Sequence, residues 1–293
     1  TLWEKLGAPE MLKKTHPCFD VTVEDKIAHI VMNRADAMNT MTREFWNDLP
    51  AIVEEIDREA LARVIVISST GKHFSAGMDL SVFSQDGAVS HQKVDRYVAA
   101  EAFRSNIRQI QHSFNALENA RVPVLFACHG GVIGGAIDMI CAGDIRWCTR
   151  DAYFCIQEIN IGMTADVGTF PRLQRFVPEG WVRELAFTGR RLPAEKAREI
   201  GLVNEVFDTH EDMMAHVMAT AREIASKNPV AVTGSKVLIT YGRDHNTADT
   251  LDYIGVWNAA MFPPPHMAEA FAAKAEKREP EFPDLMKLRK SPM

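Results

Sequence analysis

The chain has 293 residues, 46% of them hydrophobic, which is enough for one large domain or for a domain with an appendage. Its 39 aspartates and glutamates outnumber 33 lysines and arginines, and no basic arm stands out, so we expect no nucleic-acid partner. No stretch has the apolar length of a membrane span, and the charged opening TLWEKLGAPEMLKK does not resemble a secretory signal.

The first half of the chain reads as strands and helices in alternation, after a lead-in of residues 1–17 with one short helix. Residues 19–33 (FDVTVEDKIAHIVMN) alternate in polarity and predict two strands with a tight turn at Asp25–Lys26. A helix is predicted from about Thr42, which can serve as its N-cap, and residues 64–68 (VIVIS) predict a buried parallel strand. The expected buried face of that helix carries Phe45, Leu49, Ile52, Val53 and Ile56.

Two further segments complete this half. The loop at 70–80 (TGKHFSAGMDL) should pass into a helix near Asp79, and a long helix is predicted over 92–118. An apolar run at 124–128 (VLFAC) predicts another buried strand. The expected buried face of the long helix carries Phe103, Ile107, Ile110, Phe114 and Leu117.

The second half begins with short elements and ends in helices. Strands are predicted at 145–148, 153–156 and 202–207, with helices at 171–176, 180–187 and 193–200. From residue 210 no strand pattern remains, and helices are predicted at 210–227, 230–241, 247–261 and 266–278. We therefore divide the chain into the lead-in 1–17, an α/β core at 18–207 and a helical C-terminal region at 208–293.

The stretch HGGVIGGAIDMICAGDIR at 129–146 is the strongest candidate for a functional site. It packs glycines into the passage from a buried strand to a helix, where free N–H groups and the helix dipole favour negative charge. The 70–80 loop also carries glycine between a strand and a helix. The N–H groups of Met78 and Gly135 could converge on one oxygen as an oxyanion hole, although both loops could also be ordinary turns.

Three carboxylates follow in the chain: Asp138, Glu158 and Asp166. Clustered acids raise one another's pKa and can act as an acid and a base, whereas the alternative is that Glu158 and Asp166 are solvated loop residues. Asp144 and His129 are expected to be structural. Ser75 lacks the Gly-x-Ser-x-Gly frame of a nucleophile, and no phosphate-binding or dinucleotide fingerprint occurs.

The five cysteines, Cys18, Cys128, Cys141, Cys148 and Cys155, include no CxxC pair and no nearby ligand spacing. We expect them to be buried free thiols in a reducing compartment, and we expect no metal site.

With these motifs in hand, the chain resembles the crotonase (enoyl-CoA hydratase/isomerase) family. The matching pieces are HFSAGMDL, HGGVIGGAIDMICAGDIRWCT, FTGRRLPAEKAREIGLVNEVF and AFAAKAEKREPEF, and they span about residues 20–282. The resemblance implies an α/β fold, a spiral of ββα units with a helical C-terminal trimerisation region, in which trimers can pair into hexamers. It also implies an acyl-CoA substrate whose thioester oxygen is held by Met78 and Gly135.

The acids resemble one subgroup, the Δ3,5-Δ2,4-dienoyl-CoA isomerases of fatty acid β-oxidation. Asp138 and Glu158 are 20 residues apart, and Asp166 follows 8 residues later, within QEINIGMTADVGT. The resemblance implies that Glu158 and Asp166 move protons at C2 and C6 of the acyl chain and that Asp138 tunes or orients Glu158. Two alternatives stay open: a 2-enoyl-CoA hydratase that uses Asp138 and Glu158, and a non-catalytic acyl-CoA-binding scaffold.

For coenzyme A itself, the resemblance implies contacts at Ala37 and Asn39 in the loop RADAMNT and at Ala76 in HFSAGMDL. Three C-terminal residues, Phe271, Lys274 and Lys277, resemble those that reach coenzyme A of a neighbouring subunit, with a solvated helix face as the alternative. Coenzyme A is part of the substrate, so no cofactor is expected. The expected compartment is the cytoplasm for a bacterial chain, or the mitochondrial matrix for a processed eukaryotic one.

Overall fold

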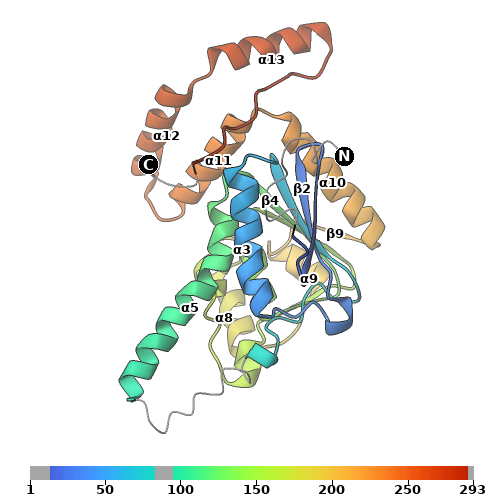
Figure 1. Ribbon diagram of the computed structural model, residues 1–293, viewed down its shortest axis with the longest axis vertical. Helices are drawn as coiled ribbons and strands as arrows, with labels where there is room; N and C mark the ends of the chain where they lie inside the picture. The colour runs from blue at the N-terminus through green and yellow to red at the C-terminus, as the bar shows by residue number, and fades with distance from the viewer. Residues whose placement is uncertain (1–13, 83–94, 290–293) are drawn as a thin grey trace.

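A six-stranded sheet forms the centre of the molecule, with helices on both of its faces (Figure 1). The computed structural model describes residues 14–82 and 95–289, so the helix expected in the lead-in lies outside the described residues. The sheet has the order β1-β2-β3-β4-β6-β9; β1 is antiparallel to β2, and the remaining pairs are parallel. Its strands are β1 (Phe19–Glu24), β2 (Ile27–Met32), β3 (Val64–Ser69), β4 (Val124–Cys128), β6 (Ile145–Thr149) and β9 (Glu205–Phe207).

A second, three-stranded sheet has the order β5-β7-β8 and lies beside the glycine-rich stretch. Its strands are β5 (Gly131–Ile133), β7 (Tyr153–Cys155) and β8 (Leu192–Pro193). The helices of the α/β core are η1 (Ala35–Ala37), α3 (Arg43–Arg58), α5 (Arg96–Asn119), α6 (Gly135–Cys141), η3 (Glu158–Ile161), α7 (Thr169–Leu173), α8 (Glu179–Thr188) and α9 (Ala194–Glu199). The predicted strand–strand–helix unit therefore recurs, as β1–β2–α3 and again as β4–β5–α6.

The hairpin between β1 and β2 is confirmed, and its turn explains the register. Asp25 and Lys26 both adopt positive φ, 49° and 64°, as a two-residue turn with the twist of the flanking strands requires. Each residue of β1 pairs with one of β2, from Phe19 with Met32 to Glu24 with Ile27.

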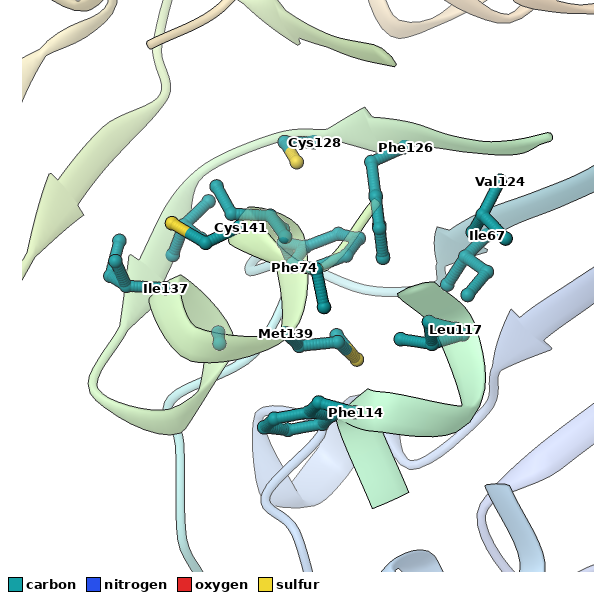
Figure 2. Packing of buried hydrophobic residues seen from close by; sticks show 14 of the residues in the cluster. Ile67, Phe74, Phe114, Leu117, Val124, Phe126, Cys128, Ile137, Met139 and Cys141 are labelled. Atoms are coloured by element: carbon teal, nitrogen blue, oxygen red, sulfur yellow. The ribbon is translucent and has the colours of Figure 1, made fainter. Parts of the chain in front are cut away.

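Strands β3 and β4 are apolar without alternation because both of their faces are buried. Ile65 and Ile67 of β3 face one core, formed mainly with α3, the end of α5, and α6. Val64 and Val66 face a second core, formed with α10 (His210–Ser226). Figure 2 shows the first core from close by, where Phe114 and Leu117 of α5, Met139 of α6, and Phe126 of β4 meet.

The long helix α5 differs from the prediction at its start. It begins at Arg96, and only its C-terminal half packs as expected: Phe114 and Leu117 are fully buried, whereas Phe103 is 60% exposed. The helix extends beyond the sheet (Figure 1), so the N-terminal part of its apolar stripe has no part of the sheet beneath it. The helix expected near Asp79 starts at Ser81, and its continuation lies outside the described residues.

Thr42 occupies the N-cap position of α3, as predicted, but its side chain makes no capping hydrogen bond. Its hydroxyl instead lies 3.4 Å from the Cys18 thiol. All five cysteines are free and buried, as expected.

The C-terminal region is helical, as predicted, and comprises α10, α11 (Pro229–Gly242), α12 (Thr247–Met261) and α13 (Pro264–Glu276). The boundary at residue 207 stays a prediction; α10, the first helix beyond it, packs directly on the six-stranded sheet. Helix α11 is held by Lys236, whose Nζ lies 2.9 Å from Asp144 Oδ2, which supports the structural reading of Asp144. Helices α12 and α13 project from the core (Figure 1).

After α13 the chain returns to the core, and Arg63 anchors it there. The Arg63 side chain is 7% exposed and donates to Asp284 Oδ1 at 2.6 Å and to the Phe282 carbonyl at 2.6 Å. It also donates to the Ala225 carbonyl at the end of α10, at 2.9 Å. One buried guanidinium, directly before β3, therefore binds both the end of α10 and the chain that returns after α13.

None of the described helices is long and apolar enough to cross a lipid bilayer.

Replacing Arg63 with methionine removes these donors and leaves buried carbonyl groups without partners. We expect Arg63→Met to lower the free energy of unfolding by about 2–4 kcal/mol, as measured by urea denaturation. The control is Arg183→Met, whose side chain is 63% exposed and pairs only with Glu179 across one turn; it should change stability by less than about 0.5 kcal/mol. Equal stability losses in the two variants would contradict the anchoring role.

Candidate active site

Two backbone segments meet at the centre of the site. Ser75 pairs with strand β5: its N–H donates to the Gly131 carbonyl at 3.1 Å, and its carbonyl accepts from Ile133 N–H at 3.1 Å. Two residues on, Gly77 lies so close to the end of β5 that a Cβ there would be 2.7 Å from the Ile133 carbonyl oxygen and 3.3 Å from Gly135 N. Gly77 also has φ +83°, so glycine is required on both grounds.

This approach sets the direction of the two candidate donors. Met41 donates to the Gly77 carbonyl at 2.8 Å and accepts from Asp79 N–H at 3.0 Å, so the N–H of Met78, between them, points away from Met41. Gly135 is the first residue of α6, where N–H groups lack intrahelical acceptors. Within residues 14–82 and 95–289, neither N–H has a protein acceptor. The structure thus brings Met78 and Gly135 to adjoining backbone segments with both donors free.

The side chains around this point form a rigid support. Asn39 Nδ2 donates to the carbonyls of Thr70 at 2.8 Å and His73 at 2.9 Å, and Ser75 Oγ donates to the Asn39 carbonyl at 2.8 Å. Ser75 Oγ also accepts from Gly77 N–H at 3.1 Å. Ser75 is therefore a fully buried structural residue, as its lack of a nucleophile motif indicated.

His129 makes the hydrogen bond expected of a structural residue: its Nε2 lies 2.9 Å from the carbonyl oxygen of Gly71, which belongs to the 70–80 loop.

Asp138 lies inside α6, 1% exposed, one turn from Gly135. Its Oδ1 accepts from the Thr169 N–H at 2.7 Å, while Oδ2 is buried without a hydrogen-bond partner in the described part of the chain. A buried, half-satisfied carboxyl is costly, which indicates a role other than stability.

Glu158 begins η3 and reaches back to the glycine turn. A Cβ on Gly134 would lie 3.3 Å from Glu158 Oε1, so this carboxyl sits beside the residue that precedes Gly135. Glu158 Oε2 is buried and has no partner among the described residues. The reading of Glu158 as a solvated loop acid is therefore wrong.

The three acids influence one another electrostatically. Burial, reinforced by the negative charges of Asp138 and Asp166, raises the pKa of Glu158 to about 7. Burial and the charge of Asp166 raise the pKa of Asp138 to about 6, against the opposing effect of the Thr169 N–H. Burial also raises the pKa of Asp166. The cluster can therefore bind and release protons near neutral pH, as acid–base chemistry requires.

Asp166 also borders a cleft of about 570 Å³ between α5, α7 and the end of α11, lined by Gln111, Asn115, Arg172 and Thr240 among others. Gln111 Nε2 donates to the Asp166 carbonyl at 2.7 Å, which ties the segment bearing this acid to α5. Asp166 is half-buried: it lines this cleft, and its charge also acts on Glu158 and Asp138.

The expected coenzyme A residues fall into two groups. Ala37, Asn39 and Ala76 lie close together, because the Ala76 N–H donates to the carbonyl of Met38, which stands between Ala37 and Asn39, at 3.0 Å. The Asn39 side chain is only 2% exposed and is used internally. The other group consists of exposed residues of α13 and its C-cap: Phe271, Lys274 and Lys277. Helix α13 projects from the core (Figure 1), so within one chain it lies apart from the 70–80 loop.

Some residues at the site were not recognised from the sequence. The space above Gly135 is bounded by Met41 and Trp46, whose Sδ and Cη2 atoms would lie 3.2 and 3.8 Å from a Cβ there. Thr169, through its N–H, is the partner of Asp138. Trp46 could have been found from the sequence, because it is a large apolar residue on the buried face of α3. Thr169 could not, because it acts through its backbone N–H, which no sequence pattern reveals.

No group of three or more His, Cys, Asp or Glu side chains within residues 14–82 and 95–289 is arranged to hold a metal ion.

Comparisons with known proteins agree with this architecture. A family model described as enoyl-CoA hydratase/isomerase matches residues 22–285. The human mitochondrial Δ3,5-Δ2,4-dienoyl-CoA isomerase is 38% identical over 260 residues, which cover 88% of this chain and 79% of the human protein. The peroxisomal isomerase of the same name from Arabidopsis thaliana is 35% identical over 272 residues, 93% of this chain and 98% of the relative. Among solved structures, an enoyl-CoA hydratase from Bacillus anthracis superposes with a TM-score of 0.79 at 25% identity, covering 90% of this chain and 98% of that one.

The electrostatic coupling of the acids can be measured without any substrate. The Glu158 carboxyl should titrate near pH 7 by ¹³C NMR of protein labelled at its carboxyl carbons. In Asp138→Asn the neighbouring negative charge is gone, so the pKa of Glu158 should fall. The control Asp208→Asn removes a carboxylate that is 74% exposed and paired with Arg150, and should leave that titration in place. A Glu158 titration that is the same in Asp138→Asn as in the native protein would contradict the coupling.

Proposed function

Because this chain belongs to the enoyl-CoA hydratase/isomerase family, we propose that it converts 3,5-dienoyl-CoA thioesters to 2,4-dienoyl-CoA thioesters in fatty acid β-oxidation. The observation that carries the proposal is the third acid. A hydratase directs two carboxyl groups at one water molecule and has no use for a charge at Asp166. The raised pKa of Asp166 and its interaction with Glu158 favour a reaction that handles protons at two places.

In the proposed reaction the thioester oxygen accepts hydrogen bonds from the N–H groups of Met78 and Gly135. Glu158, next to Gly134, takes a proton from C2, and the C–H electrons enter a conjugated dienolate whose charge the two N–H donors stabilise. The double bonds then shift to C2–C3 and C4–C5 as C6 takes the proton that Asp166, whose pKa burial raises, holds at the start of the reaction. Asp138 keeps the pKa of Glu158 high enough to act as a base near neutral pH and to hold the proton afterwards.

This chemistry uses only side chains and backbone groups of the chain, so the proposal includes no cofactor beyond the coenzyme A of the substrate and no metal ion. Ala37, Asn39 and Ala76 are proposed to contact coenzyme A. No nucleic acid or membrane partner is included.

We propose that the chain forms a trimer or a dimer of trimers through its C-terminal helices. Support comes from the large apolar side chains that these helices leave exposed: Ile239, Leu251, Val256, Met261, Met267 and Phe271. In such an assembly α13 of one subunit would bring Phe271, Lys274 and Lys277 to the coenzyme A of a neighbour. The human and Arabidopsis relatives carry the names mitochondrial and peroxisomal; for this chain the compartment stays as predicted, cytoplasmic or mitochondrial according to its source.

The decisive test compares two substrates on two variants. Dienoyl shifts change ultraviolet absorbance, so turnover of a 3,5-dienoyl-CoA can be followed directly. Asp166→Asn and Glu158→Gln should each lower kcat for this substrate by about 10²–10⁴-fold, because each removes one proton-transfer group.

The alternatives give different results in the same assay. Hydration of crotonyl-CoA that survives Asp166→Asn but not Glu158→Gln would identify a hydratase instead. A native protein that binds these thioesters without turning over either would identify a scaffold.

The oxyanion donors can be tested through Gly77. In Gly77→Ala the new methyl group overlaps the Ile133 carbonyl and pushes the loop away from Gly135, so kcat should fall by about 10²-fold or more while substrate binding changes less. Gly162→Ala provides the matched control for backbone strain, since its φ is +78° but nothing lies within 4 Å of a Cβ there. Thermal unfolding of the control measures the cost of positive φ alone. An active Gly77→Ala variant would contradict the oxyanion role of this loop.

A further inference from the structure

Helices α5, α7 and α11 are joined by one carboxylate, Glu118, that binds two arginines. Glu118 Oε2 accepts two charge-assisted hydrogen bonds, from Arg172 Nε at 3.0 Å and from Arg172 Nη2 at 2.8 Å. Glu118 Oε1 accepts from Arg243 Nη1 at 2.8 Å. Arg172 Nη2 also donates to Asn115 Oδ1 at 2.6 Å. The Arg172 side chain is only 11% exposed, so this geometry is fixed by packing as well as by charge.

Arg172 in turn packs against the segment that bears Asp166. Its Nη1 occupies the position that a Cβ on Gly168 would take, and Gly168 has φ +135°, a conformation available to glycine. The next residue, Thr169, supplies the N–H that binds Asp138 Oδ1 at 2.7 Å. Arg172 therefore packs against the short 166–169 segment, which carries Asp166 and binds Asp138 through the Thr169 N–H.

The guanidinium of Arg172 also acts electrostatically on one of the acids, Asp138. Four titratable or charged side chains act on Asp138 or are acted on by it: Asp166 of the 165–169 segment, Glu158 of η3, Cys141 of α6 and Arg172 of α7. Of these neighbours only Arg172 carries a positive charge, and it opposes the rise in the pKa of Asp138 that burial and Asp166 cause.

We infer that Arg172 is a positioning residue of this site: held by Glu118, it fixes the 166–169 segment against α6, where the Thr169 N–H binds Asp138. The kinetic part of this inference rests on the proposed function. It assigns a role to the Glu118–Arg172 pair, which lies outside the groups that touch the substrate. Arg172 acts through Gly168, Thr169 and the charge of Asp138.

The test is the pH dependence of isomerisation in Arg172→Gln. Loss of the cation leaves Asp138 protonated to higher pH, and a protonated Asp138 no longer raises the pKa of Glu158, the proposed base. Glu158 then ionises at lower pH, so the acid limb of the profile should move down. We expect the acid limb of the kcat profile to move down by about 0.5 pH unit, and kcat on its plateau to fall about tenfold because the 166–169 segment is no longer fixed. Arg172→Lys keeps the charge and should restore the acid limb, although the paired donation from Nε and Nη2 to Glu118 Oε2 is lost.

Two controls separate charge from structure. Arg175→Gln removes a neighbouring, more exposed arginine whose side chain binds Asp244 and the main-chain carbonyl of Arg243, and it should keep the native profile. Glu118→Gln leaves the charge on Arg172 but loosens its anchor, so kcat should fall without a shift of the acid limb. A uniform loss of activity in Arg172→Gln with an unmoved acid limb would overturn the inference.

A readout without substrate keeps this result apart from the proposed function. In ¹³C NMR titrations the pKa of Asp138 should rise in Arg172→Gln and stay in place in Arg175→Gln. A shifted titration in a protein that does not isomerise dienoyl-CoA would overturn only the proposed function. An unshifted titration in an active isomerase would overturn only the role of Arg172.

Discussion

The close approach of the Gly77 backbone to the end of β5 is the constraint on which the site depends. It requires glycine for two independent reasons, a positive φ and the absence of space for a Cβ. The approach is held from one side by Met41 and from the other by Ser75, whose hydroxyl also joins the loop to Asn39. Donors fixed in this way need no rearrangement when charge develops on a bound oxygen, which is why backbone N–H groups are effective there.

The acid cluster is placed at a cost to the stability of the fold. Burial raises the pKa of Asp138 from an ordinary value of 3.8 to about 6, and that of Glu158 from 4.5 to about 7. The folded chain therefore binds these protons more tightly than the unfolded chain, so their contribution to stability declines as pH rises from about 4 to about 7. Asp138 Oδ2 and Glu158 Oε2 are buried and have no hydrogen-bond partner in residues 14–82 and 95–289, which adds to this cost. Such arrangements persist where they serve chemistry.

The C-terminal region contributes to the site from a distance. Lys236 of α11 pairs with Asp144 at the start of β6, and Arg243 beyond the end of α11 binds Glu118, which in turn holds Arg172. The tail after α13 is anchored on Arg63 beside β3. These polar contacts connect the late part of the chain to α5, to the start of β6 and to β3, while the outer helices α12 and α13 keep apolar side chains exposed. The same region thus supports the core and offers a surface for association.

The sequence by itself determined the elements whose signals are local: the β1–β2 hairpin from its turn residues, β3 and β4 from unbroken apolar runs, and the C-terminal helices from their period and prolines. Family motifs also singled out Met78, Gly135 and the three acids. The sequence predicted the buried face of α5 as one stripe, but only the tertiary structure decided that Phe103 lies beyond the sheet and stays exposed. It alone decided that Gly77 meets Gly135, that Thr169 holds Asp138 and that Arg172 lies behind Gly168, because these contacts join segments far apart in the chain through backbone groups and charges that carry no local pattern.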